Sequence, residues 1–363
     1  MLKKIEFEYK GVTRTIDLES LFEVNEIRLS SSGNIFGESY LPCNGGLVPA
    51  SQYPKFAPEM KLEAQMIAYQ PVAGLTIDAI MATNGKVFIA VCKSTNENDN
   101  AAFFAYSKNL SDWTKVVLPG RTLGLKYLSE NGEFVIRLAN NKIAHFSNPE
   151  NVQIANLSVL DFDYLGGMYY IITSGSILMG NNWNDGFTPV LTGITNPMQI
   201  YCINGVIFVY GYNYYASQYY VKYSTDAGQT WANIGGVNNM VKKIVGSKDG
   251  RIFILENLQI YEITDLSTAT LLFNLSIDNT IGSILDFEYL DNIDQFIVLG
   301  NGGYAYVDLS GNTSDVFPVA VSSGAVLRYD RNTELCTFLA QNNSFCNCKP
   351  HLPELENGYV KVK

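Results

Sequence analysis

The chain has 363 residues, with 35 acidic and 25 basic side chains and a formal net charge of −10. This balance argues against a broad nucleic-acid role, because such binding depends on basic side chains that contact phosphates. No run of about 18 apolar residues is present, which excludes a membrane-spanning helix. The apolar content of 47% is enough for a substantial core.

The first 35 residues predict short β-strands. Ile5, Phe7 and Tyr9 alternate with charged residues, and residues 12–18 continue the pattern after a Lys-Gly turn. Residues 21–29 fit either a strand or a short helix. The alternation does not fit a signal peptide, so we expect folding in a cytoplasm and free thiols at the six cysteines. These segments predict a small β-rich platform.

Residues 40–56 contain an aromatic-Leu-Pro-Cys-Asn-Gly-Gly stretch and then Tyr-Pro-Lys-Phe. The segment resembles the tail collar motif of bacteriophage tail proteins, with Asn44 in place of the usual Asp and Phe56 where Leu is more common. An irregular linker rich in proline and glycine is the alternative. The resemblance implies a virion protein of the phage tail.

From about residue 72 the chain repeats a polar turn followed by an apolar strand. The turns begin at residues 84, 131, 166, 204, 249, 292 and 331, so the spacings are 47, 35, 38, 45, 43 and 39 residues. A period near 40 residues with about four short strands is typical of a β-propeller. The spacing predicts seven blades, with six as the alternative because the last repeat is poorly patterned.

Two near copies, residues 160–165 (LDFDYL) and 285–290 (LDFEYL), each precede a turn. We expect them to be equivalent innermost strands. Residues 358–363 alternate and carry lysines, which predicts an outer edge strand of the last blade. Cys346, Cys348 and His351 lack a convincing fourth ligand, so we expect no metal and no cofactor.

Residues 223–231 (YSTDAGQTW) carry a hairpin-turn motif. Short polar side chains at Ser224 and Asp226 can bond to nearby backbone, and Gly228 can take a positive φ. Thr230 and Trp231 then begin a strand, with the indole available to wedge against the neighbouring sheet. The stretch resembles the Asp-box of sialidase-like propellers, which implies a structural turn rather than chemistry.

The sequence contains few combinations of residues that could form a catalytic site. The chain has two histidines, His145 and His351, and lacks the Arg-Ile-Pro segment and converging arginines that a sialidase would require. A glycosidase needs two suitably separated carboxylates, and four candidates lie on the predicted inner strands: Asp161, Asp163, Asp286 and Glu288. Charged residues there also fit a solvated channel lining. We therefore expect no enzyme activity, with a carbohydrate-active hydrolase as the alternative.

A tyrosine-rich stretch, residues 210–220, joins the second and third strands of the fourth repeat, on the rim opposite the Asp-box turn. Tyrosines offer flat apolar faces and hydroxyls, which suit a sugar or a protein partner. The expected binding residues are Tyr212, Tyr214, Tyr215 and Tyr219. The alternative is a long hairpin whose tyrosines pack on adjacent blades.

Together these features predict an all-β chain with a β platform in residues 1–71 and a propeller in residues 72–363. The resemblances imply a structural, receptor-binding component of a phage tail, baseplate or fibre, made in the host cytoplasm. We expect residues 1–70 to contact other virion proteins, the chain to form a symmetric homo-oligomer, and the propeller to bind a host glycan or protein. A cellular propeller used as an interaction scaffold is a further alternative.

Overall fold

The computed structural model describes residues 79–92, 103–108, 112–184, 186–276, 279–291, 293–314, 316–321, 325–330, 335–339, 345–347 and 354–361, together with five short strands before residue 69. The chain divides into two compact units, one of residues 66–348 and the other of residues 1–65 with 349–363. Among the described residues, one 3-10 turn, η3 (Asn279–Ile281), interrupts an otherwise all-β structure. No helix in this part of the chain is long and apolar enough to cross a membrane.

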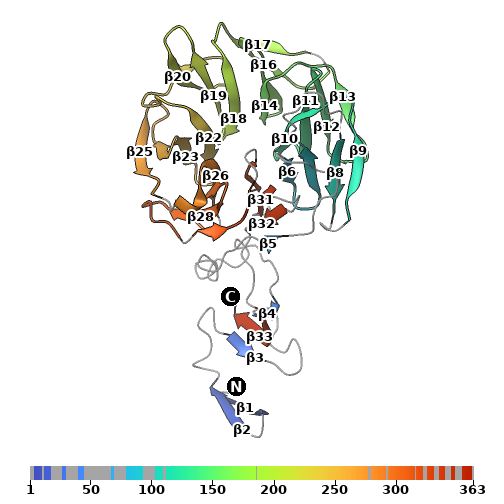
Figure 1. The fold of residues 1–363 in the computed structure, drawn as a ribbon, viewed down its shortest axis with the longest axis vertical. Helices are drawn as coiled ribbons and strands as arrows, with labels where there is room; N and C mark the ends of the chain where they lie inside the picture. Colours follow the sequence, from blue (N-terminus) through green and yellow to red (C-terminus); the bar gives the residue numbers. More distant parts are fainter. Residues whose placement is uncertain are drawn as a thin grey trace. The chain divides into compact units, whose positions relative to one another are not determined.

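The larger unit is a β-propeller. Six of its sheets, here called blades one to six, each contain four antiparallel strands that follow one another in sequence (Figure 1). Blade one contains β6 (Ala79–Thr83), β7 (Phe88–Cys92), β8 (Phe103–Ser107) and β9 (Thr114–Val117). Blade two contains β10 (Thr122–Leu128), β11 (Glu133–Leu138), β12 (Lys142–Phe146) and β13 (Gln153–Ala155). Blade three contains β14 (Asp161–Leu165), β15 (Met168–Ile172), β16 (Ser176–Gly180) and β17 (Thr188–Thr192).

The next three blades repeat this order. Blade four contains β18 (Pro197–Ile203), β19 (Val206–Asn213), β20 (Gln218–Ser224) and β21 (Ala232–Asn233). Blade five contains β22 (Val241–Gly246), β23 (Ile252–Glu256), β24 (Gln259–Ile263) and β25 (Ala269–Asn274). Blade six contains β26 (Ile284–Leu290), β27 (Gln295–Gly300), β28 (Gly303–Asp308) and β29 (Phe317–Pro318).

One further four-stranded sheet belongs to this unit but is not built from consecutive strands. It joins β30 (Arg328–Asp330), β31 (Leu335–Leu339) and β32 (Phe345–Asn347) to β5 (Ile67–Ala68), which comes from before blade one. β30 contacts β26 of blade six, and β31 contacts β6 of blade one. The structure therefore supports six blades of consecutive strands rather than the seven that the turn spacing predicts.

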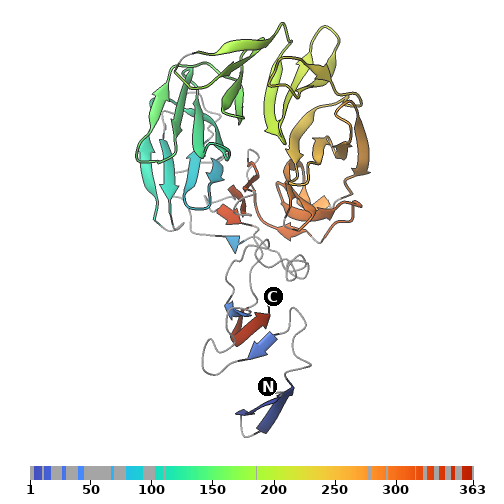
Figure 2. The same cartoon turned by 180° about the vertical axis from the view of Figure 1, so that it is seen from behind.

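The first strand of each blade lies nearest the middle of the ring. β14 contacts β18, β18 contacts β22, and β22 contacts β26, so these strands follow one another around the centre (Figures 1 and 2). The expectation that residues 160–165 and 285–290 supply equivalent innermost strands is confirmed, because β14 and β26 are both first strands. Tight hairpins turn the chain outward. In blade four, Asn204 and Gly205 take φ values of +51° and +80°, as a two-residue turn requires.

The core lies between blades. The second strand of a blade is covered on both faces, which is why each repeat contains a continuous apolar run rather than an alternation. All five residues of β23 are buried, and Phe253 and Leu255 pack with blade six, whereas Ile254 packs with blade four. The same kind of cluster joins blades one and two. Burial of these faces holds neighbouring blades together.

The smaller unit contains two separate sheets. β1 (Lys4–Tyr9) pairs with β2 (Val12–Asp17), and β33 (Glu354–Lys361) lies between β3 (Ile27–Leu29) and β4 (Tyr40–Asn44). Residues 27–29 are thus a strand rather than a helix. The rest of the collar-like segment, residues 45–56, lies outside the described residues.

Two expectations about the C-terminal residues are wrong. The edge strand expected at residues 358–363 does not close the last blade, because residues 358–361 belong to β33, which pairs with β3 and β4 in the smaller unit. Residues 362–363 lie outside the described residues. The outer position beside β32 is instead taken by β5. The larger unit therefore ends near residue 348 rather than at residue 363, and it begins before residue 72.

Candidate functional site

The inner wall carries carboxylates that reach from one blade to the next. Asp161 and Asp163 on β14 point to the same side, and Phe162 between them is buried in the core. Asp161 Oδ2 accepts the backbone N–H of Ile200 at 2.9 Å, and Asp163 Oδ2 accepts that of Cys202 at 2.8 Å. Both acceptors thus serve β18 of the next blade.

One lysine pairs with a carboxylate of β14, and another pairs with two on β26. Lys126 on β10 lies 2.9 Å from Asp161 and donates to the carbonyl of Ile200 at 3.3 Å. Lys243 on β22 lies 3.2 Å from Asp286 and 2.5 Å from Glu288. Burial raises the pKa of Asp163 and of Glu288, and the nearby lysines oppose this shift without cancelling it.

These contacts bear on the glycosidase alternative. Three of the four candidate carboxylates accept backbone N–H groups from outside their own blade. Asp161 and Asp163 accept from β18, and Asp286 Oδ2 accepts from Leu327, just before β30, at 2.9 Å. The fourth, Glu288, is 9% exposed and paired with Lys243. The contacts between blades therefore explain the positions of these four carboxylates, and no catalytic role is needed to explain them.

A second buried polar cluster joins blades two and three. Glu133 accepts hydrogen bonds from Tyr169 at 2.7 Å and from Trp183 at 3.0 Å, and its other oxygen lies 2.8 Å from His145 Nδ1. Burial raises the pKa of Glu133, but the hydrogen bonds from His145, Trp183 and Tyr169 outweigh it and lower the pKa overall. Sequence analysis missed this cluster, because its residues are separated by up to 50 positions.

The Asp-box turn has the hydrogen bonds that its residues predict. Ser224 Oγ accepts the N–H of Gly228 at 2.8 Å, and Gly228 has a φ of +88°. Asp226 accepts from the backbone and the hydroxyl of Thr230 at 2.8 and 2.6 Å, and the hydroxyl bond is the main reason that its pKa falls to about 2. Trp231 Nε1 donates to Val190 O on β17 at 3.2 Å, so the indole wedges against blade three.

Blade six contains a second turn of this kind, which sequence analysis did not predict. Asp308 accepts from the backbone of Asn312 and from its side-chain amide, both at 2.9 Å. The spacing of four residues matches that between Asp226 and Thr230. Asn312 replaces the threonine, and no tryptophan follows, which hides the relation at the level of sequence.

The predicted tyrosines occupy the β19–β20 hairpin, and the structure brings three of the four together. Tyr212 packs against Tyr214 and Tyr219, with ring centroids 5.1 and 4.8 Å apart. Tyr219 also stacks on the buried Tyr210 at 5.8 Å. Tyr215 stands apart at the hairpin tip and is 94% exposed, while Tyr214 is 63% exposed.

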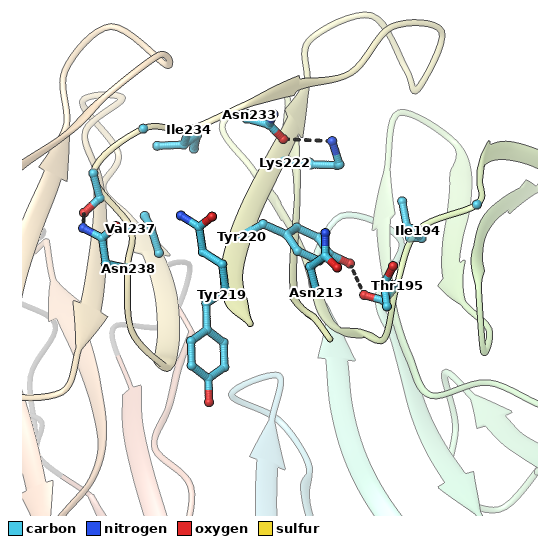
Figure 3. Close-up of a pocket in the computed structure, with 14 residues that line it drawn as sticks. Ile194, Thr195, Asn213, Tyr219, Tyr220, Lys222, Asn233, Ile234, Val237 and Asn238 are labelled. Atoms are coloured by element: carbon cyan, nitrogen blue, oxygen red, sulfur yellow. Dashed lines mark hydrogen bonds between the residues drawn. The ribbon is translucent and has the colours of Figure 1, made fainter. Parts of the chain in front are cut away.

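A cavity of about 370 Å³ lies beside this hairpin (Figure 3). It is bounded by the β17–β18 connection, by β20 and by the segment that leaves β21. Of the predicted binding residues, Tyr219 lines the cavity, whereas Tyr212, Tyr214 and Tyr215 do not. The lining residues are Gly193, Ile194, Thr195, Asn213, Gln218, Tyr219, Tyr220, Lys222, Asn233, Ile234, Gly235, Gly236, Val237 and Asn238.

Tyr219 and Tyr220 serve opposite sides of this cavity, because successive side chains on a strand alternate. Tyr219 packs with the apolar cluster shared with blade five, and the Tyr220 hydroxyl donates to Thr195 O at 2.9 Å on the side of blade three (Figure 3). Sequence analysis did not select Tyr220 or the polar residues around it. The available signal was a cluster of glycines and asparagines at residues 233–239, which begins at the end of the two-residue outer strand β21.

No metal site is evident in the part of the chain that the structure describes, where no group of three or more His, Cys, Asp or Glu side chains converges. Cys348 and His351 lie outside the described residues. Cys202, on the inner strand of blade four, is a free thiol as expected.

Comparisons with known proteins show the fold and nothing finer. No protein family model matches the chain, and no curated protein matches it in sequence. Among solved structures, virginiamycin B lyase from Staphylococcus aureus is similar, with a TM-score of 0.62 and 12% identity over 78% of this chain and 98% of that chain. The WD40 β-propeller domain of Doa1 gives 0.58 and 11% over 78% and 96%, and the WD40 repeats of RRP9 give 0.55 and 10% over 79% and 98%.

These neighbours place the larger unit among the β-propellers, a fold that carries many unrelated functions. One is an enzyme and two are WD40 repeats, and at 12% identity or less the likeness defines the fold alone. The activity of this chain must therefore be argued from its own residues.

Proposed function

We propose that this chain is a non-enzymatic component of a bacteriophage virion, located in the tail, baseplate or fibre and made in the host cytoplasm. The phage assignment rests on the resemblance of residues 40–56 to the tail collar segment. The role in attachment rests on the rim of blade four, where the exposed Tyr214 and Tyr215 stand beside a cavity lined by polar and apolar residues. This rim carries the proposal, because it combines exposed tyrosines with an accessible cavity.

The propeller, in this proposal, presents its rim to a host glycan or protein. Residues 1–70 contact other virion proteins, and a symmetric homo-oligomer repeats that contact around the particle. The two-unit organisation supports such a division, since the smaller unit contains strands from both ends of the chain. A small β unit with little core of its own gains stability from a partner.

We also propose that the composite sheet of β30, β31, β32 and β5 acts as a seventh blade. The support is a repeated contact. Lys126, Asp161 and Ile200 connect blades two, three and four, and Lys243, Asp286 and Leu327 connect blades five and six with the segment before β30 in the same way. The composite sheet thus occupies the place that blade four has in the first set.

An enzymatic reading has less support. Virginiamycin B lyase also occurs as a catalytically inactive histidine-to-alanine variant with quinupristin, so that enzyme requires a histidine. In the described part of this chain the sole histidine, His145, is buried against Glu133 and Trp183 and does not line the cavity. A lyase of that kind is therefore not proposed.

The test is to locate the chain in particles. Antibodies raised against the propeller should label the tail of virions that the same genome encodes, and mass spectrometry of purified particles should recover the chain in a fixed ratio to other tail proteins. Its absence from purified particles, with abundant protein in the lysate, would overturn the proposal and favour a cellular scaffold. Release of sugar from host polysaccharide, lost on changing Asp286 or Glu288 to its amide, would favour a hydrolase.

A further inference from the structure

The outer edge of β20 is open beside the cavity. β21 pairs only with Lys222 and Tyr223, because its two residues end at Asn233. The chain then leaves blade four, and Gly235 bridges to Thr268 of blade five. Gln218, Tyr219 and Tyr220 therefore have no strand opposite them on this side among the described residues.

The open edge offers backbone hydrogen-bonding groups. Val221 O accepts the N–H of Ile234 on the β21 side at 2.9 Å. Because backbone groups of alternate residues point to the same side of a strand, the N–H and C=O of Tyr219 face the same edge. These groups lie where Tyr219 lines the cavity. A ligand seated there meets one donor and one acceptor held in fixed directions.

The cavity is lined by both polar and apolar side chains, the latter being Ile194, Ile234 and Val237, and no lining side chain is negatively charged. The polar side chains include the amides of Asn213, Gln218, Asn233 and Asn238, and the ammonium group of Lys222, which donates to Asn233 Oδ1 at 2.8 Å. No aspartate or glutamate is among the lining residues, although the chain as a whole carries a net charge of −10. Lys222 is thus the one charged side chain among the residues that line the cavity.

The aromatic residues complete the site. Tyr219 and Tyr220 line the cavity from opposite faces of β20, and the hydroxyl of Tyr220 is fixed by Thr195 O. Amide side chains provide both donors and acceptors, and Ile194, Ile234 and Val237 add apolar surface beside the tyrosines. Vicinal hydroxyls with an apolar ring face, the chemistry of a sugar, match this combination.

We propose that this cavity binds a short saccharide and that Lys222 favours a saccharide with a carboxylate over its neutral counterpart. A volume of about 370 Å³ suits one or two sugar units. A peptide strand fits less well, because only three residues of β20 are open and few ladder hydrogen bonds can form. This inference rests on the proposed attachment role and names the ligand class for it.

The test uses the full chain in solution with matched oligosaccharides of two to four units that end either in glucuronic acid or in glucose. Titration calorimetry should detect binding of the acidic member. Lys222→Met should weaken that binding about tenfold, as expected for a lost hydrogen bond to a charged group, and should change binding of the neutral member less than threefold. Gln218→Ala should weaken both members.

Lys248→Met is the matched control, because Lys248 is exposed in the β22–β23 turn of blade five, does not line the cavity and should leave binding unchanged. Unfolding midpoints within error of the unaltered chain will show that each variant is folded. The proposal is overturned if neither saccharide binds, or if an extended peptide binds the site and the saccharides do not. It is also overturned if Lys222→Met weakens binding of the acidic and the neutral saccharide equally. Incorporation of the chain into virions is measured separately. A chain that is incorporated but binds no saccharide would contradict the saccharide site alone, whereas a chain that is not incorporated would contradict the proposed virion role.

Discussion

Lys126 and Lys243 share two equivalent contacts at two places on the inner wall, three blades apart. Lys126 pairs with Asp161 of the next blade and donates to Ile200 O beyond it. Lys243 pairs with Asp286 of the next blade and donates to Leu327 O beyond it, at 3.0 Å. Each lysine therefore connects three successive sheets near the centre of the ring.

The two lysines differ in burial, and this predicts different costs of removal. Lys243 is buried between two carboxylates, so Lys243→Met removes the cation paired with both and should cost about 3–5 kcal/mol of unfolding free energy. Lys126 has a side chain that is 23% exposed and a single carboxylate partner, so Lys126→Met should cost about 1–2 kcal/mol. Equal losses in urea titrations would contradict this ranking.

The cost of Lys243→Met should also depend on pH. Burial already raises the pKa of Glu288, and Lys243 opposes that shift. Removal of the lysine raises the pKa further, so the folded variant takes up a proton that the unfolded chain releases. Its stability should then fall as pH rises through the folded pKa of Glu288. Urea titrations at pH 5 and pH 8 should show a smaller loss at pH 5, and Lys243→Met with Glu288→Gln should remove part of the difference.

The sequence predicted the repeats because turn chemistry and apolar strands are local. Asn204-Gly205 and the strand after it need no information from the rest of the fold. The composite sheet was not predictable in the same way, since β5 is two residues long and lies almost 280 positions from its partner β32. The cavity was missed for a related reason. It results from the early end of β21, and of its lining residues only Tyr219 was among the expected binding residues, although Asn213, Gln218 and Tyr220 lie in the same tyrosine-rich stretch.

We expect the protein to lose stability in acid as Glu133, which joins blades two and three, takes up a proton. The folded pKa of Glu133 is lowered, so its contribution is present above the unfolded value near 4.5 and is lost as pH falls through the folded pKa. Thermal unfolding followed from pH 6 to pH 3 should fall less steeply in Glu133→Gln than in the unaltered chain. Glu150→Gln, at an exposed position, should leave the slope unchanged. An unchanged slope in Glu133→Gln would show that the hydrogen bonds from Tyr169 and Trp183 do not favour the carboxylate.

We expect the packing and the hydrogen bonds of Trp231 in the Asp-box to contribute separately to the free energy of unfolding. The indole is partly exposed and packs against blade three, so Trp231→Ala should cost about 2–3 kcal/mol, less than for a fully buried tryptophan. Trp231→Phe keeps most of the packing but loses the bonds to Val190 O and Gly228 O, at about 1 kcal/mol. Thr225→Ala, exposed in the same turn, is the control. A loss below about 1 kcal/mol for Trp231→Ala in denaturant titration would mean that the indole does not wedge the blades.

The boundaries of the larger unit predict how the chain tolerates truncation. A fragment of residues 66–348 keeps every strand of the propeller, including β5 beside β32, and omits β33, which pairs only with strands of the smaller unit. It should unfold in one cooperative transition with a β-type circular dichroism spectrum. A fragment of residues 72–348 lacks β5, so the outer edge of β32 is left unpaired and its thermal midpoint should be lower. Equal midpoints would show that β5 does not close the ring, and failure of the longer fragment to fold would show that the propeller depends on the smaller unit.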